Sequence, residues 1–128
     1  MMSDQYTFQE EPLAPEAQQT EGRAAKPGGD SFCGVAAAVA VLGDAWTLLL
    51  VRDLADEPRR FTALQASTGI SPRVLTDRLH KMMDEGLVTR HIYAEIPPRV
   101  EYALTPKGRD AVTVVAALRS YGERWLRP

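Results

Sequence analysis

The apolar residues of the chain recur with a helical period from residue 33 onward. Residues 33–42, CGVAAAVAVL, are apolar on nearly every side, which predicts a helix buried in a core or an interface. Asp44 can cap a second helix over residues 45–56, after which EPRR forms a connector. We expect the second helix to turn one face inward and to leave Arg52, Asp53 and Asp56 outside; that inward face consists of Trp46, Leu49, Leu50 and Leu54.

Residues 61–90 predict a short helix, a turn and a longer helix. The first helix, FTALQAST, ends at Gly69, and Ser71 and Pro72 suit the cap and the first position of the second. Gly86 fits the left-handed position that ends a helix. The second helix should bury Leu75, Leu79, Met82 and Met83, which leaves an outer face of short hydrogen-bonding groups and cations rather than a mixture of Glu and Lys.

After Gly86 the period of the apolar residues changes to two. LVTRHIYA and RVEYALT alternate, and EIPP between them forbids a helix, so a β-hairpin with a proline-stiffened tip is predicted. Thr105 and Pro106 then cap a last helix with a long apolar stripe. The expected fold is mainly α with a small β-hairpin wing.

This order of elements predicts a winged helix-turn-helix. Two short helices joined by a tight turn form a helix-turn-helix, and its second helix enters the major groove of DNA. We expect major-groove contacts from Ser71, Pro72, Arg73, Thr76 and Asp77. Phosphate and wing contacts are expected from Arg60, Arg78, Lys81, Arg90 and Arg99. The same geometry occurs in modules that bind only proteins, so a winged-helix protein-interaction module is the alternative.

Charge is distributed unevenly along the chain. The net charge of the 128 residues is -2, but residues 1–30 hold six acidic and two basic residues, which gives -4 for this segment and +2 for the rest. Pro, Gln and Gly are frequent in residues 1–30 and apolar residues are scattered, so we predict a disordered acidic tail before a folded domain over residues 31–128. The sequence shows no signal-peptide pattern and no apolar run of about 18 residues, and its single cysteine fits a reducing cytoplasm.

The chain lacks the motifs of the common catalytic and metal sites. It has no H-E-x-x-H, no glycine-rich phosphate loop after a strand and no paired cysteines for zinc. A Cys–His hydrolase would need Cys33 beside His80 or His91, and no pattern places them together. We therefore expect no enzyme, no metal and no cofactor.

The segment "LGDAWTLLLVRDL…RRFTALQASTGISPRVLTDRLHKMMDEGLVTRHIYAEIPPRVEYALTPKGRD" closely resembles the HxlR-type family of winged-helix transcription regulators, relatives of the MarR group. The most specific elements are ISPRVLTDRL, EGLV and PPRVEYALTPKG, which occur in register. The resemblance implies a homodimer on a two-fold-symmetric, pseudo-palindromic operator, usually near the regulator's own gene. Repression is the commoner mode in the family. The acidic tail departs from the usual short N terminus of the family.

The apolar faces of the first and last helices also predict a dimer. They carry more apolar surface than the domain needs for its own core, and a two-fold interface would close over Ala36, Val39, Ala40, Val115, Leu118, Tyr121 and Trp125. The alternative is that these residues only cover the core of one chain.

Cys33 is the candidate for receiving a signal. It lies near the start of the first helix, where unpaired backbone N–H groups favour a thiolate that oxidants or electrophiles attack. The resemblance implies such sensing in some family members, here by an adduct or a bond between subunits. The alternatives are a small buried residue at an interface, or control by a small ligand in a pocket among Phe32, Trp46, Tyr121 and Trp125.

Overall fold

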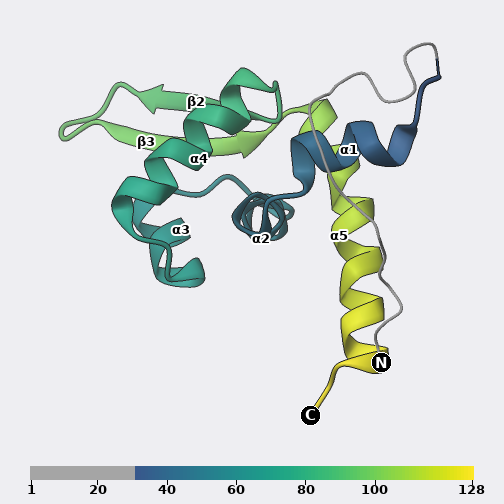
Figure 1. The fold of residues 1–128 in the computed structure, drawn as a ribbon. Helices are drawn as coiled ribbons and strands as arrows, with labels where there is room; N and C mark the ends of the chain where they lie inside the picture. The colour runs from purple at the N-terminus through teal and green to yellow at the C-terminus, as the bar shows by residue number, and fades with distance from the viewer. Residues whose placement is uncertain (1–30) are drawn as a thin grey trace. The chain divides into compact units, whose positions relative to one another are not determined.

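The computed structural model describes residues 31–128, so the predicted acidic tail over residues 1–30 lies outside the described part. The mainly α class with a hairpin wing is confirmed (Figure 1). The elements in chain order are α1 (Gly34–Leu42), α2 (Ala45–Leu54), α3 (Phe61–Thr68), α4 (Pro72–Asp84), β2 (Val88–Tyr93), β3 (Arg99–Leu104) and α5 (Pro106–Trp125). The chain divides into two compact units after Ala40, and each is described by itself.

The helix α1 is uncharged, and none of its residues is buried. Cys33 directly precedes it, and the Cys33 carbonyl oxygen accepts the N–H of Ala37 at 3.0 Å. Val35 and Val39 are 75% and 61% exposed. Of the two predicted environments, a core and an interface, the structure does not show the first for this helix, and the second remains a prediction.

Among residues 31–128 no single helix is long and apolar enough to cross a membrane. Only α1 and α2 taken together, as a broken pair, reach that length and composition.

The core of the unit from Val41 to Pro128 draws residues from α2 to α5 and from β2. Its buried members are Leu50, Val51, Leu54, Leu64, Ile70, Leu75, Leu79, Met82, Leu87, Val88, Ala111 and Val115. α2 is rotated from the predicted orientation, because Thr47 and Val51 are buried while Trp46 and Leu49 are only half-buried. The run LLLV is apolar on two adjacent faces, so the period alone could not choose between them.

The hairpin pairs β2 and β3 antiparallel, from Val88 opposite Leu104 to Tyr93 opposite Arg99. Arg59 adds a one-residue bridge to β3, since its N–H donates to the carbonyl oxygen of Tyr102 at 3.0 Å and its carbonyl oxygen accepts the N–H of Tyr102 at 2.8 Å. The predicted connector EPRR therefore extends the sheet. A single extended residue has no period, which is why the sequence pattern did not show it.

The start of α5 is packed tightly against the end of α4. Thr105 caps α5, because its Oγ1 accepts the N–H of Gly108 at 3.0 Å, and the same hydroxyl donates to the carbonyl oxygen of Gly86. A Cβ on Gly108 would lie 2.1 Å from the carbonyl oxygen of Leu87. This close approach requires glycine and fixes where α5 leaves the wing.

Candidate nucleic-acid interface

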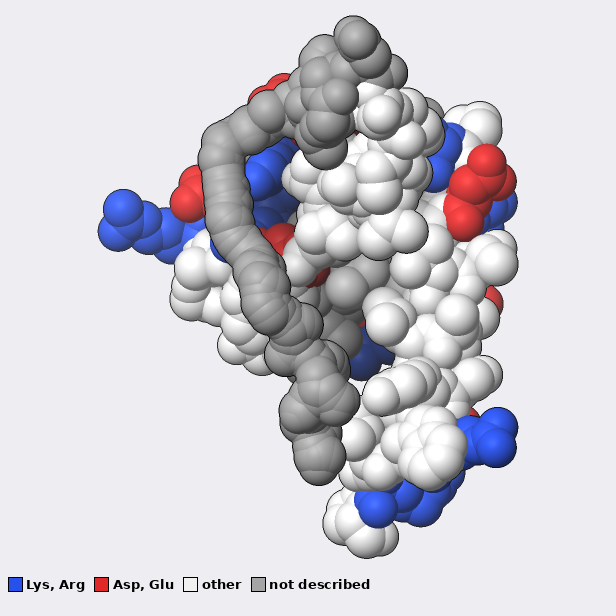
Figure 2. Space-filling view, turned by 45° about the vertical axis from the view of Figure 1, so that its right-hand side comes forward, with Lys and Arg blue, Asp and Glu red and all other residues white. Residues whose placement is uncertain are grey.

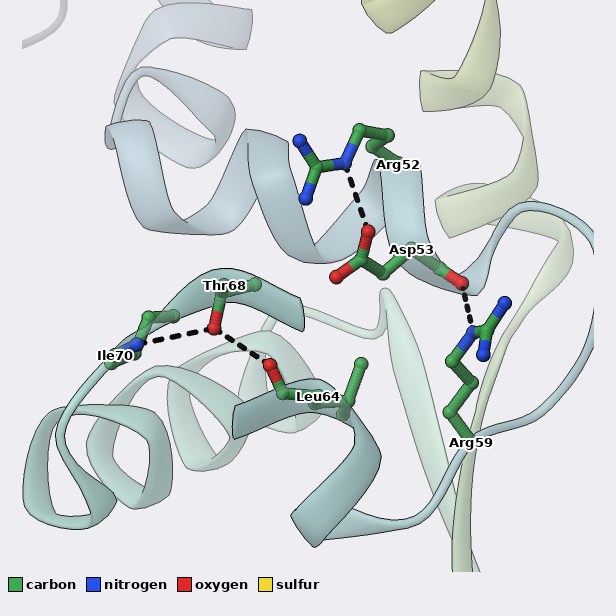
Figure 3. A network of polar contacts seen from close by, with 6 residues as sticks. All are labelled: Arg52, Asp53, Arg59, Leu64, Thr68 and Ile70. Carbon is green, nitrogen blue, oxygen red and sulfur yellow. Dashed lines mark hydrogen bonds and ion pairs between the residues drawn. The ribbon is translucent and has the colours of Figure 1, made fainter. Parts of the chain in front are cut away.

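The turn between α3 and α4 is fixed by a left-handed glycine and a threonine side chain. Gly69 has φ 75° and ends α3. Thr68 Oγ1 donates to the carbonyl oxygen of Leu64 at 2.7 Å and accepts the N–H of Ile70 at 3.3 Å (Figure 3). Ile70 is only 2% exposed, so the turn is anchored in the core and sets the angle between the two helices.

The N terminus of α4 has the predicted boundary. Ser71 Oγ accepts the N–H of Val74 at 3.3 Å, and Pro72 occupies the first turn. At the other end the N–H of Leu87 donates to the carbonyl oxygen of Met82 at 2.8 Å, and Gly86 has φ 77°. These bonds form a Schellman closure, so both ends of α4 are fixed by local contacts.

The outer face of α4 gathers four of the predicted DNA-binding side chains. We call Arg73, Thr76, Asp77 and Lys81 the reading face; all four are exposed, while Leu75 and Leu79 beneath them are buried. The spacing of three, four and eight residues from Arg73 brings them to one side of the helix. Thr76 Oγ1 donates to the carbonyl oxygen of Pro72 at 2.9 Å. Contact of this face with DNA remains a prediction.

The sequence analysis expected Arg78 to contact phosphate, but in the free chain Arg78 is paired with Asp44. Its Nε is 2.8 Å from Asp44 Oδ2, in an ion pair that is not aligned as a hydrogen bond, and its side chain is 29% exposed. Asp44 Oδ1 meanwhile accepts the N–H groups of Trp46 and Thr47, at 2.7 and 3.1 Å. One carboxylate therefore caps α2 and holds α4. The sequence indicated the cap, but it carried no signal for the pair with Arg78.

The wing presents one arginine that is paired and one that is exposed. Arg99 lies 2.9 Å from Glu95 and 3.1 Å from Glu101, and its guanidinium is 3.9 Å from the centre of the Tyr93 ring. Desolvation lowers the pKa of Arg99, but the hydrogen bond to Glu95 and the charges of Glu95 and Glu101 outweigh it, so the pKa is raised. The guanidinium of Arg99 is thus already paired with two carboxylates in the free chain, and its contact with phosphate remains a prediction.

Arg90 on β2 and Arg60 before α3 are both exposed. Six cations were predicted to contact DNA. The four that are exposed and have no carboxylate partner in the described structure are Arg60, Arg73, Lys81 and Arg90.

A further polar network connects α2 to Arg59, the residue that forms the one-residue bridge to β3. Asp53 Oδ1 accepts Arg52 Nε at 2.8 Å, and the carbonyl oxygen of Asp53 accepts Arg59 Nε at 2.8 Å (Figure 3). The Asp53 side chain is 8% exposed, so the expectation that it points into solvent is wrong. The network holds Arg59 against the end of α2 and so supports the base of the wing.

The side chains that were weighed for signalling or catalysis are exposed, apart from the half-buried Trp46. Cys33 Sγ accepts the N–H of Ala36 at 3.4 Å, so the thiol caps α1. His80 and His91 are exposed, and within residues 31–128 no cluster of three or more His, Cys, Asp or Glu could hold a metal ion. Phe32, Tyr121 and Trp125 are 84%, 60% and 64% exposed, and a ligand pocket that involves them remains a prediction.

The predicted dimer residues of α5 separate into two groups. Val115 is 9% exposed and belongs to the core, so its assignment to an interface was wrong. Leu118, Tyr121 and Trp125 are exposed, and Figure 2 shows a largely uncharged surface on the side where α5 runs. Ala36 is half-buried in α1, whereas Val39 and Ala40 are exposed. Whether these residues meet a second copy remains a prediction.

Comparison with known proteins gives consistent matches over the same region. The model of the family described as HxlR-like helix-turn-helix matches residues 41–128, which is more than half of the chain. A relative from Synechocystis, the HTH-type transcriptional regulator sll1512, is 39% identical over 96 residues, which cover 74% of this chain and 71% of the relative.

Two of the similar solved structures are regulators in chemically modified forms. The redox regulator HypR in its oxidized form has a TM-score of 0.70 and 31% identity, covering 75% of this chain and 100% of that one. Diamide-treated YodB from Bacillus subtilis has a TM-score of 0.62 and 28% identity, covering 76% of this chain and 98% of that one.

Proposed function

The chain belongs to the HxlR-like helix-turn-helix family of transcriptional regulators, and from this premise we propose that it is a sequence-specific repressor that binds its operator as a homodimer. The resemblance noted in the sequence is thereby confirmed. The observation that carries the proposal is the reading face of α4, which is exposed and polar on a helix whose two ends are fixed. The relatives are named as transcriptional regulators, which are not enzymes.

The reading face divides into groups suited to bases and to phosphates. Arg73 lies in the first turn of α4, where an arginine can donate two hydrogen bonds to guanine, and Asp77 can accept from the amino group of cytosine. Lys81, Arg60 and Arg90 supply cations for phosphates, which fix the register of the protein on the duplex. Ser71 and Pro72 stay in the proposed contact surface at the exposed tip of the helix, whereas Arg78 and Arg99 leave it.

The proposed dimer rests on exposed apolar surface. α1 has no charged and no buried residue, and α5 exposes Leu118, Tyr121 and Trp125. Exposed apolar patches of this kind mark interaction sites. A two-fold dimer would set its two copies of α4 about 34 Å apart, one turn of DNA, and would favour a pseudo-palindromic operator. We place the protein in the cytoplasm as part of the same proposal.

The proposed function is tested by measuring fluorescence anisotropy of the full chain on the duplex upstream of its own gene and on a scrambled duplex, across a salt series. We expect much tighter binding to the native duplex. Arg73→Ala should cost about 1–3 kcal/mol on the native duplex and little on the scrambled one. Lys81→Ala, the matched control on the same helix, should weaken both and reduce the salt slope by about one.

Two outcomes of that experiment would count against the proposal. Equal losses on both duplexes would show that Arg73 touches only phosphate. Equal and weak binding of the unaltered protein, followed by no bound site in a genome-wide search, would favour the alternative of a protein-interaction module.

A redox or electrophile signal at Cys33 is the finer part of the proposal. The exposed thiol caps α1, and two of the similar structures are those of an oxidized redox regulator and a diamide-treated regulator. Diamide would take up two hydrogens as two Cys33 thiols form one disulfide between subunits, whereas an electrophilic carbon would add to a single thiolate.

Cys33→Ser should bind the operator like the unaltered protein but keep its affinity after diamide, as measured by anisotropy before and after treatment. A response to diamide that persists in Cys33→Ser would locate the sensor elsewhere, and a small ligand would then be the next candidate signal.

A further inference from the structure

Thr76 is held on the reading face by a hydrogen bond to its own helix. Its Oγ1 donates to the carbonyl oxygen of Pro72 at 2.9 Å, so the hydroxyl proton points back along α4. A threonine hydroxyl has one O–H to donate. What Thr76 offers to a partner is therefore its methyl group and a lone pair of the hydroxyl oxygen, rather than a hydrogen-bond donor.

The same hydrogen bond determines where the methyl group lies. Threonine branches at Cβ, so a single side-chain rotation places both the hydroxyl and the methyl group. The backbone beneath is fixed, because Ser71 caps the helix and Leu75 is buried next to Thr76. Thr76 is exposed, and it thus presents an apolar group whose position is set before any ligand binds.

The major groove offers one apolar group to such a side chain. Guanine N7 and O6, adenine N7 and thymine O4 are acceptors and need a donor, which Thr76 lacks in this conformation. The amino groups of adenine and cytosine are donors that only the hydroxyl lone pair could accept, whereas the C5-methyl group of thymine is the apolar feature that matches the methyl group of Thr76. Building on the proposed function, we infer that Thr76 selects a thymine by packing its methyl group against the C5-methyl, next to the base contacted by Arg73.

The neighbours of Thr76 fit this assignment. Arg73 lies three residues earlier and Asp77 directly follows, and both are exposed polar groups on the same helix surface. The apolar contact of Thr76 would lie beside an arginine donor and a carboxylate acceptor. Three different chemical groups, a donor, a methyl group and an acceptor, would then read neighbouring positions of one half-site.

The experiment starts from a binding site selected by the full chain from a pool of randomised duplexes. Anisotropy is then measured on the consensus duplex and on duplexes in which single thymines are replaced by uracil, which lacks only the methyl group. One position in each half-site should lose about fourfold in affinity on this replacement, as expected for one buried methyl group.

Two variants separate the methyl group from the hydroxyl. Thr76→Val keeps a methyl group and removes the hydroxyl, so it should bind the thymine duplex within about twofold of the unaltered protein and keep the uracil penalty. Thr76→Ser keeps the hydroxyl and removes the methyl group. It should bind the thymine duplex about fourfold more weakly and no longer distinguish uracil at that position.

The opposite pattern would overturn the inference. Weak binding by Thr76→Val with full affinity in Thr76→Ser would show that the hydroxyl makes the contact, and an unchanged uracil penalty in Thr76→Ser would assign the thymine to another residue. A pool that yields no consensus would instead refute the proposed sequence-specific function. The two failures are therefore distinguishable.

Discussion

Gly108 has the shortest added-Cβ contact among the glycines that lie in the helices of residues 31–128. A Cβ there would meet the carbonyl oxygen of Leu87 at 2.1 Å and Cδ2 of Leu104 at 3.1 Å. The oxygen belongs to backbone at the end of the α4 closure, so it cannot turn aside as a flexible side chain would. The first turn of α5 can approach the backbone at Leu87 this closely because Gly108 has no side chain.

We expect Gly108→Ala to lower the free energy of unfolding by about 3 kcal/mol, the upper part of the range for overpacked sites. The measurement is urea unfolding followed by circular dichroism. Gly122→Ala is the control in the same helix, since nothing lies within 4 Å of its added Cβ. It should stabilise by about 0.5–1 kcal/mol through helix propensity. Equal effects of the two changes would contradict the close approach at Gly108.

The wing differs from the reading helix in how its charges are used. On α4 the cations Arg73 and Lys81 are exposed, whereas on the hairpin Arg99 is shared between Glu95 and Glu101 and lies over Tyr93. Arg90 is the exposed arginine of β2. We therefore expect the hairpin to contact phosphate through Arg90 on β2 rather than through Arg99 on β3.

Arg90→Ala should therefore reduce the slope of log affinity against log salt by about one, while Arg99→Ala should leave the slope unchanged. Both slopes are obtained by anisotropy on the same operator duplex. A fall of equal size in both variants would show that Arg99 leaves its carboxylates when DNA binds.

The elements that could be predicted from sequence are those fixed by near neighbours. Both ends of α4 followed from Ser71, Pro72 and Gly86, because caps and left-handed closures involve residues a few positions apart. The inward face of α2 was misplaced, because LLLV is apolar on two sides.

The sequence predicted those features of the candidate site that depend only on which face of a helix a residue occupies. Arg73, Thr76, Asp77 and Lys81 share the expected face. The partner of Arg78 depends on how α2 meets α4. The partners of Arg99 are close in sequence, since Glu101 lies two residues on in β3 and Glu95 four residues back in the hairpin loop, but the alternation of the strands did not indicate which charges would pair. The bond from Thr76 to Pro72 depends on the choice of one side-chain rotamer, and a spacing pattern does not contain it.

At the scale of the whole molecule, the chain has more apolar surface than its own core uses. Ala111 and Val115 close the core, while farther along α5 the residues Leu118, Tyr121 and Trp125 are exposed. Trp125 is 64% exposed in the single chain, so its removal should cost the isolated fold little.

Trp125→Ala should raise the dissociation constant of the dimer by about 30-fold, as for a central interface residue, while the thermal unfolding of the chain changes little. Sedimentation equilibrium over a range of concentrations measures the first quantity. Glu123→Ala, exposed on the same helix but outside the apolar stripe, is the control and should leave the dimer intact. An undiminished dimer in Trp125→Ala would place the interface elsewhere.

The carboxylate of Asp44 has a mechanical consequence for the whole regulator. Its two oxygens contact different helices: Oδ1 accepts N–H groups of the first turn of α2, and Oδ2 forms an ion pair with Arg78 in the middle of α4. A displacement of Gly43 and Asp44 must either break the ion pair between Asp44 and Arg78 or move α4 together with them. The residue that caps α2 thus also helps to orient α4, so the position of the reading face is set in part from outside the helix-turn-helix itself.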